Sequence, residues 1–370
     1  MPQQKERLSS LRKLADAHGL DALVLGMPAN VLWLSGFDMV GTFYFTAALV
    51  TPEHAPALLV HRAELDMARE ESAFDEIAVW GHGQDHVEAL GAWLTERVGP
   101  LAGRRVGVEL DDWLRPRDLA AIADRLGLTW VDVGAEVEEL RQRVEGEELA
   151  RARAAGRIAD MTIAVGSSAV ASGVGEHEIA AAALRCYALA GGQEQPVPLS
   201  VRSGPRLPLA RALPSDRRLA AGEAVALEAW ATVRRCAAVA ATTTVAGAPA
   251  EDLLTAWEAL EAVLDVVESA LRPSATGAGL WEEAAGVAAA AGAQLDEPAG
   301  FGLALAFPLR PTTRWRLAPG GGALAAGQVV CVAPRVRAGA SAAFAARTYA
   351  LDDLAATPLT HRPQLWSVGA

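Results

Sequence analysis

The chain has 370 residues, 51% of them hydrophobic and 21% charged, which is typical of a globular protein and long enough for two domains. Its formal net charge of -12 argues against nucleic acid or an anionic membrane as a partner. No apolar run approaches the ~20 residues of a membrane span, and the first residues lack the apolar core of a signal peptide, so we expect a cytoplasmic protein.

The first 143 residues alternate between short apolar runs and amphipathic segments. A charged amphipathic stretch over 3–18 predicts a surface helix, and 19–25 leads into a strand. The alternation continues with strands near 43–51, 57–60, 76–80 and 105–108 and helices near 62–71, 84–98 and 116–126. This order predicts an α/β domain in which helices cover both faces of the sheet.

The most informative stretch runs from residue 203 to 245. Residues 222–230 form a mostly apolar run of strand length with one carboxylate, Glu228, in its interior, and 237–245 is typical of its hairpin partner. A lone acid in a buried strand is unfavourable unless it is paired, protonated or bound to a cation. Glu228 is therefore a candidate either for catalysis or for a buried ion pair.

The last third of the chain continues with helices and strands. Apolar residues at steps of three and four predict a helix over 251–271, and a second helix is expected over 278–291. The strands that we expect to share one curved antiparallel sheet are 223–230, 236–245, 328–334 and 342–350.

Several motifs occur in the order in which one known family carries them. They are MPANVLWLSGF at 27–37, SGP at 203–205, SDR at 215–217, GFGLAL at 300–305 and LAAGQVVCVAP at 324–334. The chain resembles the creatinase, prolidase and aminopeptidase P family (M24). The resemblance implies a two-domain α/β protein, with a creatinase-like N-terminal domain over 1–143 and an α+β pita-bread domain over 144–370. It also implies a homodimer.

The resemblance assigns the positions at which the family holds two metal ions. In this chain they fall on Glu228, Val239, Phe301, Ala333 and Ala346. Val, Phe and Ala side chains offer no lone pair to a metal, so one potential ligand remains. We therefore predict no metal and no other cofactor, and we do not expect a metallopeptidase.

The family's histidine position falls on Arg211, whose guanidinium stays protonated and cannot act as a general base. We predict Glu228 and Arg211 as the catalytic residues. Arginines clamp carboxylates and phosphates, which favours a small anionic substrate; the alternative is that individual arginines are surface residues or ion-pair partners. The predicted substrate-binding residues are Arg206, Trp230, Phe301, Arg310, Arg347 and His61. His61 is included because the N-terminal domain of the partner subunit borders the site in creatinase-like dimers.

These residues indicate a metal-independent, creatinase-like enzyme, a hydrolase or lyase. Its substrate would be a small metabolite that is anionic or contains an amidine or amide group. Acid–base catalysis would drive hydrolysis of a C–N bond, elimination or cyclisation. The heavy use of Ala, Gly and Arg suggests a bacterial genome, and the reaction would suit secondary metabolism. The alternative is a catalytically inactive, peptidase-like pseudoenzyme that binds a peptide or a protein.

Overall fold

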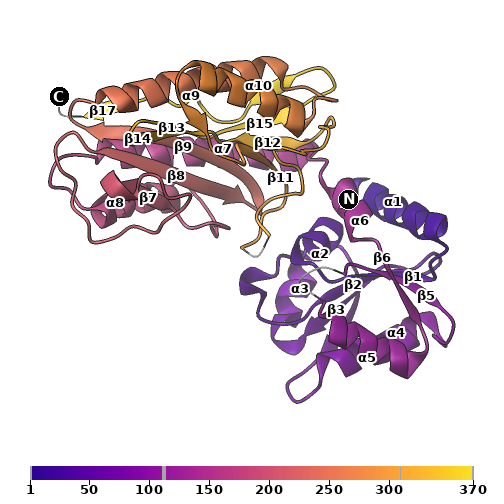
Figure 1. Ribbon diagram of the computed structural model, residues 1–370. Helices are drawn as coiled ribbons and strands as arrows, with labels where there is room; N and C mark the ends of the chain where they lie inside the picture. The colour runs from indigo at the N-terminus through magenta and orange to yellow at the C-terminus, as the bar shows by residue number, and fades with distance from the viewer. Residues whose placement is uncertain (1, 111–113, 309, 369–370) are drawn as a thin grey trace. The chain divides into compact units, whose positions relative to one another are not determined.

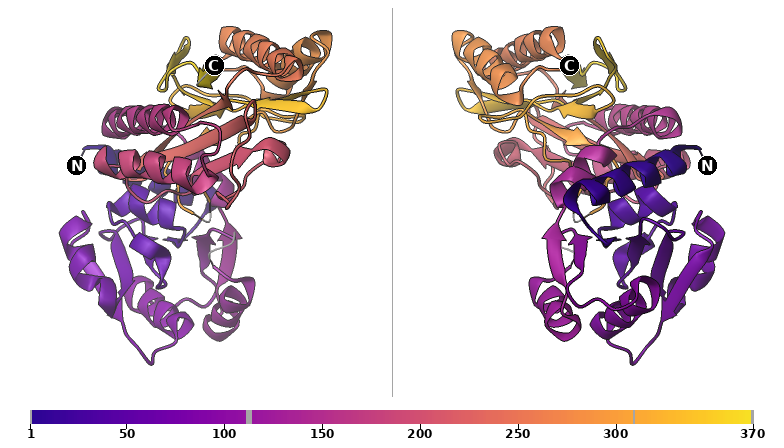
Figure 2. Two further views of the ribbon diagram at one scale, coloured as in Figure 1. Left: turned by 90° about the vertical axis from the view of Figure 1, so that its left-hand side faces the viewer. Right: turned by 90° about the vertical axis from the view of Figure 1, so that its right-hand side faces the viewer.

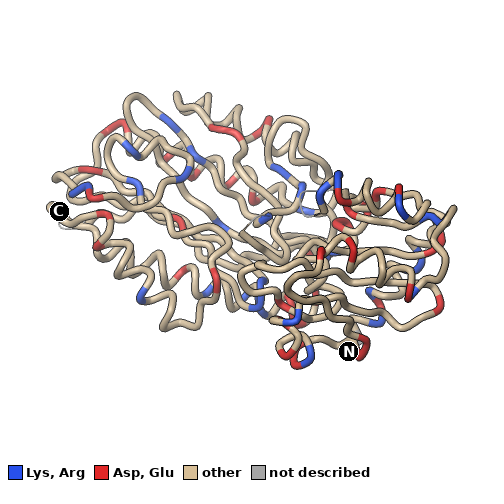
Figure 3. Tube along the Cα trace, turned by 90° about the horizontal axis from the view of Figure 1, so that it is seen from below, with Lys and Arg blue, Asp and Glu red and all other residues tan. Residues whose placement is uncertain are grey.

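The structure is a computed structural model that describes residues 2–110, 114–308 and 310–368. The chain forms two compact units, Met1–Arg141 and Gln142–Ala370, where the sequence predicts a boundary after residue 143. In the described part of the chain, every helix is too short or too polar to cross a membrane. Figure 3 shows acidic and basic residues interspersed along the trace of each unit.

The N-terminal unit is built on one sheet with the strand order β4-β3-β2-β1-β5-β6 (Figure 1). The pairs β1–β2 and β2–β3 are antiparallel, and the remaining pairs are parallel. The strands are β1 (Ala22–Leu25), β2 (Ala47–Val50), β3 (Ala57–His61), β4 (Glu76–Trp80), β5 (Arg105–Val108) and β6 (Thr129–Asp132). The helices are α1 (Pro2–His18), α2 (Pro28–Ser35), α3 (Leu65–Glu71), α4 (His86–Val98), α5 (Pro116–Leu126) and α6 (Gly134–Arg141).

Helices cover both faces of this sheet because both faces are apolar. On one face, Trp93 of α4 and Ile122 of α5 pack with Leu49 and Val106 of the strands in one buried cluster. Helices α1, α2 and α6 contact one another and lie on the opposite side (Figure 1). The prediction of an α/β domain is therefore confirmed.

The C-terminal unit contains three hydrogen-bonded ladders, β17-β9-β8-β7, β11-β12-β15-β16 and β10-β13-β14. Their strands are β7 (Ser200–Ser203), β8 (Ala224–Val233), β9 (Cys236–Ala246), β10 (Gln294–Leu295), β11 (Gly300–Leu303), β12 (Val329–Val332), β13 (Arg335–Ala338), β14 (Ser341–Phe344), β15 (Arg347–Leu351), β16 (Ala356–Pro358) and β17 (Trp366–Val368). The helices are α7 (Gly146–Ser168), α8 (Glu176–Leu189), α9 (Glu251–Ala270) and α10 (Gly277–Ala290). Figure 2 shows α9 and α10 side by side.

Each helix pair covers the outer face of one half of the strands. Leu227 of β8 packs in a cluster with Ile179 of α8, and Ala240 of β9 packs with Ile158 of α7. In the other half, Val332 of β12 belongs to the large cluster around α9 and α10. Because side chains alternate along a strand, the intervening residues of both halves point inward. These inward residues define the inner face of the C-terminal unit.

The expectation that four strands share one continuous sheet is wrong in detail. The β8–β9 and β12–β15 ladders are separate, and they are joined where Ala241 and Ala346 exchange backbone hydrogen bonds of 3.3 and 3.1 Å. The hydroxyl of Thr348 reinforces this junction by donating to the carbonyl of Val239 (2.8 Å). The predicted strand 342–350 is split into β14 and β15 because Ala346 pairs with Ala241 between them.

Candidate functional site

Strand alternation gathers the candidate residues of the C-terminal unit on its inner face. Glu228 pairs directly with Ser200, and Trp230 pairs with Val239, so these side chains share one side of their ladder. In the other half, Phe301 pairs with Cys331 and Cys331 with Thr348. The inner face residues discussed below are Ser200, Arg202, Glu228, Trp230, Val239, Phe301, Cys331 and Thr348.

Glu228 is almost completely buried, and its carboxylate lies between an indole and two arginines. Oε1 accepts a hydrogen bond of 2.8 Å from Nε1 of Trp230 and lies 3.7 Å from Nε of Arg211. Oε2 lies 3.7 Å from Nη1 of Arg202. Glu228 and Arg211 therefore do lie together, as the sequence leads us to expect, and the ion-pair alternative for Glu228 is also part of the geometry.

Arg202, which is not among the residues predicted from the sequence, is the arginine most tightly enclosed in this group. It lies on β7, its side chain has no exposed surface, and its guanidinium carbon lies 4.6 Å from the centre of the Phe344 ring. Burial lowers the pKa of Arg202, and the nearby charge of Glu228 opposes that shift. The signal that could have found it is a charged residue in the apolar run just before the SGP motif, two positions from Ser200 and therefore on its side of the strand.

Trp230 and Phe301 connect the two halves of the inner face. Their rings stack with centroids 5.0 Å apart and planes 6° apart, and both side chains are buried. The guanidinium carbon of Arg211 lies 5.7 Å from the centre of the Trp230 ring. Trp230 thus positions the Glu228 carboxylate through its N–H; a direct role of Trp230 and Phe301 in substrate binding stays a prediction.

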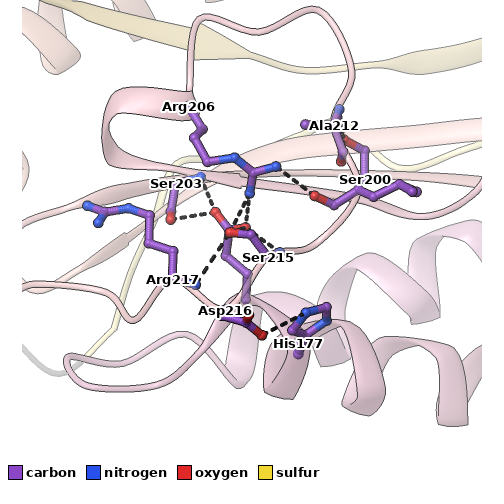
Figure 4. Close-up of polar contacts among 10 residues, drawn as sticks. His177, Ser200, Ser203, Arg206, Ala212, Ser215, Asp216 and Arg217 are labelled. Atoms are coloured by element: carbon purple, nitrogen blue, oxygen red, sulfur yellow. Dashed lines mark hydrogen bonds and ion pairs between the residues drawn. The ribbon is translucent and has the colours of Figure 1, made fainter.

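A second buried carboxylate, Glu176, binds the SGP and SDR motifs together, and Figure 4 labels its partners Ser203, Arg206 and Ser215. Its Oε1 accepts the backbone N–H (2.9 Å) and hydroxyl (2.7 Å) of Ser203, and its Oε2 accepts the same two groups of Ser215 at the same distances. Arg206 forms an ion pair with Oε2 and donates to the carbonyl of Leu213 (2.7 Å). We call this group, Glu176 with Ser203, Arg206 and Ser215, the Glu176 clasp.

Two of the predicted substrate-binding arginines have structural partners instead. Arg206 belongs to the Glu176 clasp. Arg347 pairs with Val332 on the outer face of β15, where it forms an ion pair of 2.9 Å with Glu268 of α9. Thr348 faces inward opposite Cys331, and adjacent residues of a strand point to opposite faces, so Arg347 points outward.

The other two predicted residues are Arg310 and His61. Arg310 donates its backbone N–H to the carbonyl of Phe307 (3.0 Å), and its role in substrate binding stays a prediction. His61 belongs to the N-terminal unit, where its buried ring stacks on Tyr44 at 3.8 Å. Burial, together with the positive charges of His82 and Arg62, lowers the pKa of His61.

The structure locates the four residues without a metal-binding side chain that the family resemblance assigns to metal positions. Val239 and Phe301 lie on the inner face, Ala333 follows β12, and Ala346 lies at the junction of the two ladders. Among residues 2–110, 114–308 and 310–368, no three His, Cys, Asp or Glu side chains are grouped so that they could hold a metal ion. Burial and the charge of Glu228 raise the pKa of the Cys331 thiol, which disfavours its thiolate form.

Comparison with known proteins places both units in one family. The model of the creatinase/prolidase N-terminal domain matches residues 7–143, and that of metallopeptidase family M24 matches residues 150–351. The chain therefore belongs to family M24, with a creatinase-like N-terminal domain and a C-terminal domain of the pita-bread fold.

Individual relatives carry the same two-domain fold. An Xaa-Pro dipeptidase of Pyrococcus furiosus is 25% identical over 275 residues, which cover 72% of each chain. The crystal structure of a prolidase from Pyrococcus horikoshii OT3 matches with a TM-score of 0.84 at 21% identity, over 97% of this chain and 99% of that one. A dipeptidase, PepE, from Mycobacterium ulcerans also gives 0.84, at 23% identity over 99% and 98% of the two chains.

Proposed function

We propose that this chain is a metal-independent member of family M24 that acts on a small metabolite at the inner face of its C-terminal unit. The observation that carries the proposal is the environment of Glu228. A single buried carboxylate lies between two guanidinium groups and an indole N–H, on the face where the family resemblance puts two metal ions. The reaction would be hydrolysis of a C–N bond, elimination or cyclisation.

The residues at the family's metal positions do not fit a dinuclear centre. Val239, Ala333 and Ala346 have no donor atom, and the Phe301 ring is stacked against Trp230. The remaining carboxylate, Glu228, already accepts a hydrogen bond on one oxygen and faces an arginine at 3.7 Å on each. A divalent cation placed beside it would meet two positive charges, which opposes binding.

The chemistry proposed for this site uses Glu228 as the group that transfers a proton. A positioned carboxylate can accept or deliver a proton at a reacting nitrogen or carbon, which is worth about 10²–10⁴-fold in rate. Arg211 has a half-exposed side chain and would contact an anionic group of the substrate. Trp230 would hold the carboxylate in position through its N–H.

A binding protein without catalysis is the second candidate, and one observation favours it. Glu228 has only 4% of its side chain exposed, and its contacts resemble those of a buried ion pair. If Glu228 only neutralises Arg202 and Arg211, it stabilises the fold and takes no part in a reaction. The protein would then bind a peptide or a protein partner.

Three measurements test the proposal. Elemental analysis of the purified protein should find well under one equivalent of Mn, Co, Zn or Fe, and the dipeptide Ala-Pro should resist cleavage with or without added Mn²⁺. A panel of N-acyl and N-amidino amino acids should contain a compound that the protein converts, as followed by mass spectrometry. Its conversion should continue at the same rate when a metal chelator is added. Stoichiometric metal that is needed for turnover would refute metal independence.

The Glu228→Gln variant then separates the two candidates. With the compound that the panel identifies, an enzyme that uses Glu228 should lose about 10²–10⁴-fold in kcat. Glu178→Gln is the matched control, because Glu178 is exposed and forms an ion pair of 3.0 Å with Arg218 on the surface. Wild-type turnover by a folded Glu228→Gln protein would reject the catalytic role and favour the binding protein.

A further inference from the structure

In the part of the chain that the structure describes, one edge of the Arg202 guanidinium lacks a hydrogen-bond partner. Nη1 donates to the carbonyl of Ala210 and lies 3.7 Å from Oε2 of Glu228. Within the described residues, neither Nε nor Nη2 of Arg202 has a hydrogen-bond partner, although both atoms are buried. These two N–H groups form one side of the planar guanidinium fork, which can bind both oxygens of a carboxylate.

The charges around this edge also favour binding of an anion, because positive groups outnumber negative ones. Two guanidinium groups, those of Arg202 and Arg211, lie within ion-pair distance of a single carboxylate, Glu228. The next arginine in electrostatic range of Arg202 is Arg335, which is itself paired with Asp296 at 2.6 Å. The group of three therefore carries one excess positive charge, and one monovalent anion would balance it.

Water alone would satisfy only part of this deficit. A bridging water can accept hydrogen bonds from Nε and Nη2, but it brings no negative charge. Burial disfavours the charged form of Arg202 and lowers its pKa, and the positive charges of Arg335 and Arg211 act in the same direction. A bound carboxylate would supply two hydrogen-bond acceptors. Its negative charge would also favour the charged form of Arg202 and so raise the pKa that burial lowers.

The segment 207–214 contacts β7 beside Arg202 through hydrogen bonds of Ala210 and Ala212. Ala210 accepts from Arg202, and Ala212 both accepts from the Ser200 hydroxyl (2.8 Å) and donates to it (3.2 Å). Leu207 anchors the start of the segment in the core, but Leu209 and Leu213 are 46% and 64% exposed, so apolar burial contributes little to holding residues 208–214 closed. Local opening of such a segment requires less free energy than unfolding of the core.

We propose that Arg202 and Arg211 form the binding site for the carboxylate group of a small organic substrate, held side-on by Nε and Nη2 of Arg202. The carboxylate enters when the segment 207–214 opens, and it lies beside Glu228. This inference rests on the proposed function, because it names the substrate class of the same site. It does not depend on which bond the protein changes.

Calorimetric titration of the full chain in low-chloride buffer tests the site with a matched pair of probes, N-acetylglycine and N-acetylglycinamide. They differ in that the first carries a carboxylate and the second a neutral amide. We expect saturable binding of the acid with a Kd of roughly 1 mM. The amide should bind at least ~10-fold more weakly, because it lacks the charge that pairs with arginine.

Substitutions locate the binding. Arg202→Lys should weaken binding of the acid by ~10–100-fold, since an ammonium group cannot form the planar fork. Arg211→Gln, at a half-exposed position, should weaken it by ~10-fold and serves as the second variant if Arg202→Lys fails to fold. Arg337→Lys is the control, and we expect it to leave binding unchanged. Arg337 lies on β13 and forms its ion pair with Asp296, not with Glu228.

Three results would overturn the site: equal binding of acid and amide, wild-type binding by both arginine variants, or binding of chloride or phosphate that N-acetylglycine does not displace. The last result would assign the edge to an inorganic anion. The proposed reaction fails separately, by wild-type turnover in Glu228→Gln. Because binding is measured without turnover, rejecting the carboxylate site does not reject the catalytic role of Glu228, and rejecting that role does not reject the site.

Discussion

Glu176 and Glu228 are two buried carboxylates of the same unit, and both lie beside arginines. Glu176 receives direct hydrogen bonds on both oxygens, from Ser203 on one and from Ser215 on the other. Glu228 receives a direct hydrogen bond from Trp230 on one oxygen, while its arginines lie at 3.7 Å, and within the described residues Oε2 has no hydrogen-bond partner. One carboxylate is saturated by the fold and the other is not.

This difference separates a structural role from a functional one. A buried ion that the surrounding backbone satisfies needs no further partner, and the Glu176 clasp joins α8 to both ends of the segment that contains residues 207–214. A buried group that lacks partners indicates a place where something else binds or reacts. The two residues therefore make opposite predictions for stability and for activity.

The largest effect on stability is expected from Glu176→Gln. The amide has one acceptor oxygen and would point its NH₂ group at N–H or O–H donors, which leaves Arg206 and a serine unsatisfied. Breaking a buried pair of this kind costs about 3–5 kcal/mol, or roughly 10 °C in the Tm of a unit of this size. Thermal unfolding should show it, with the exposed Glu178→Gln variant within about 0.5 kcal/mol of wild type. Equal Tm values for the two variants would contradict the structural role.

A smaller loss of stability, about 2 kcal/mol, is expected from Glu228→Gln. The Gln carbonyl can still accept the Trp230 hydrogen bond, and no direct hydrogen bond to an arginine is broken. Urea unfolding of the full chain measures it beside Glu176→Gln. If Glu228→Gln proved the more destabilising of the two, the comparison between a saturated and an unsaturated carboxylate would be reversed.

Acid should weaken the Glu176 clasp selectively. Burial alone would raise the pKa of Glu176, but hydrogen bonds from Ser203 and Ser215 and the charge of Arg206 outweigh it and hold the pKa below its ordinary value. A carboxyl with a lowered pKa stabilises the fold fully above its unfolded pKa of about 4.3, and this contribution is lost as the pH falls through the folded pKa. The stability gap between wild type and Glu176→Gln should therefore be constant above pH ~5 and narrow below it. If the difference in stability between wild type and Glu176→Gln widened as the pH fell, the claim that the fold lowers the pKa of Glu176 would be wrong.

The smallest effect is expected from Arg347→Met, which removes the ion pair with Glu268 on the outer face. This substitution should lower stability by roughly 1 kcal/mol and leave binding of N-acetylglycine unchanged, because the residue faces α9. Calorimetry on this variant repeats the measurement made on Arg202→Lys. Weakened acid binding in Arg347→Met would restore Arg347 to the site.

The sequence predicts the fold better than the site, for reasons that these residues make plain. Ser203 and Ser215 belong to recognisable motifs because they bind Glu176, so the motifs report the scaffold. Arg202 escaped notice because its partner strand is remote in sequence and the pairing of β7 with β8 sets which residues face Glu228. Arg347 was predicted to bind substrate, but it lies on the outer face of β15, and which face a strand residue takes depends on the pairing of β15 with β12.

Glu228 was the residue that the sequence identified for sound physical reasons. A carboxylate in an apolar strand has to meet a compensating group wherever the chain folds. Its nearest partner in sequence, Trp230, follows from the same alternation, since i and i+2 share a face of a strand. What the sequence could not supply is the distance of each arginine, which depends on how the segment 207–214 closes over β7.

The stack of Trp230 on Phe301 makes the inner face optically readable. The indole N–H ends on the Glu228 carboxylate and its ring lies near the Arg211 guanidinium, so a change of charge in this group alters the field across the chromophore. Subtracting the emission spectrum of Trp230→Phe from that of wild type would remove the signal of the other nine of the ten tryptophans. Ligands could then be screened by light alone, before any product is known.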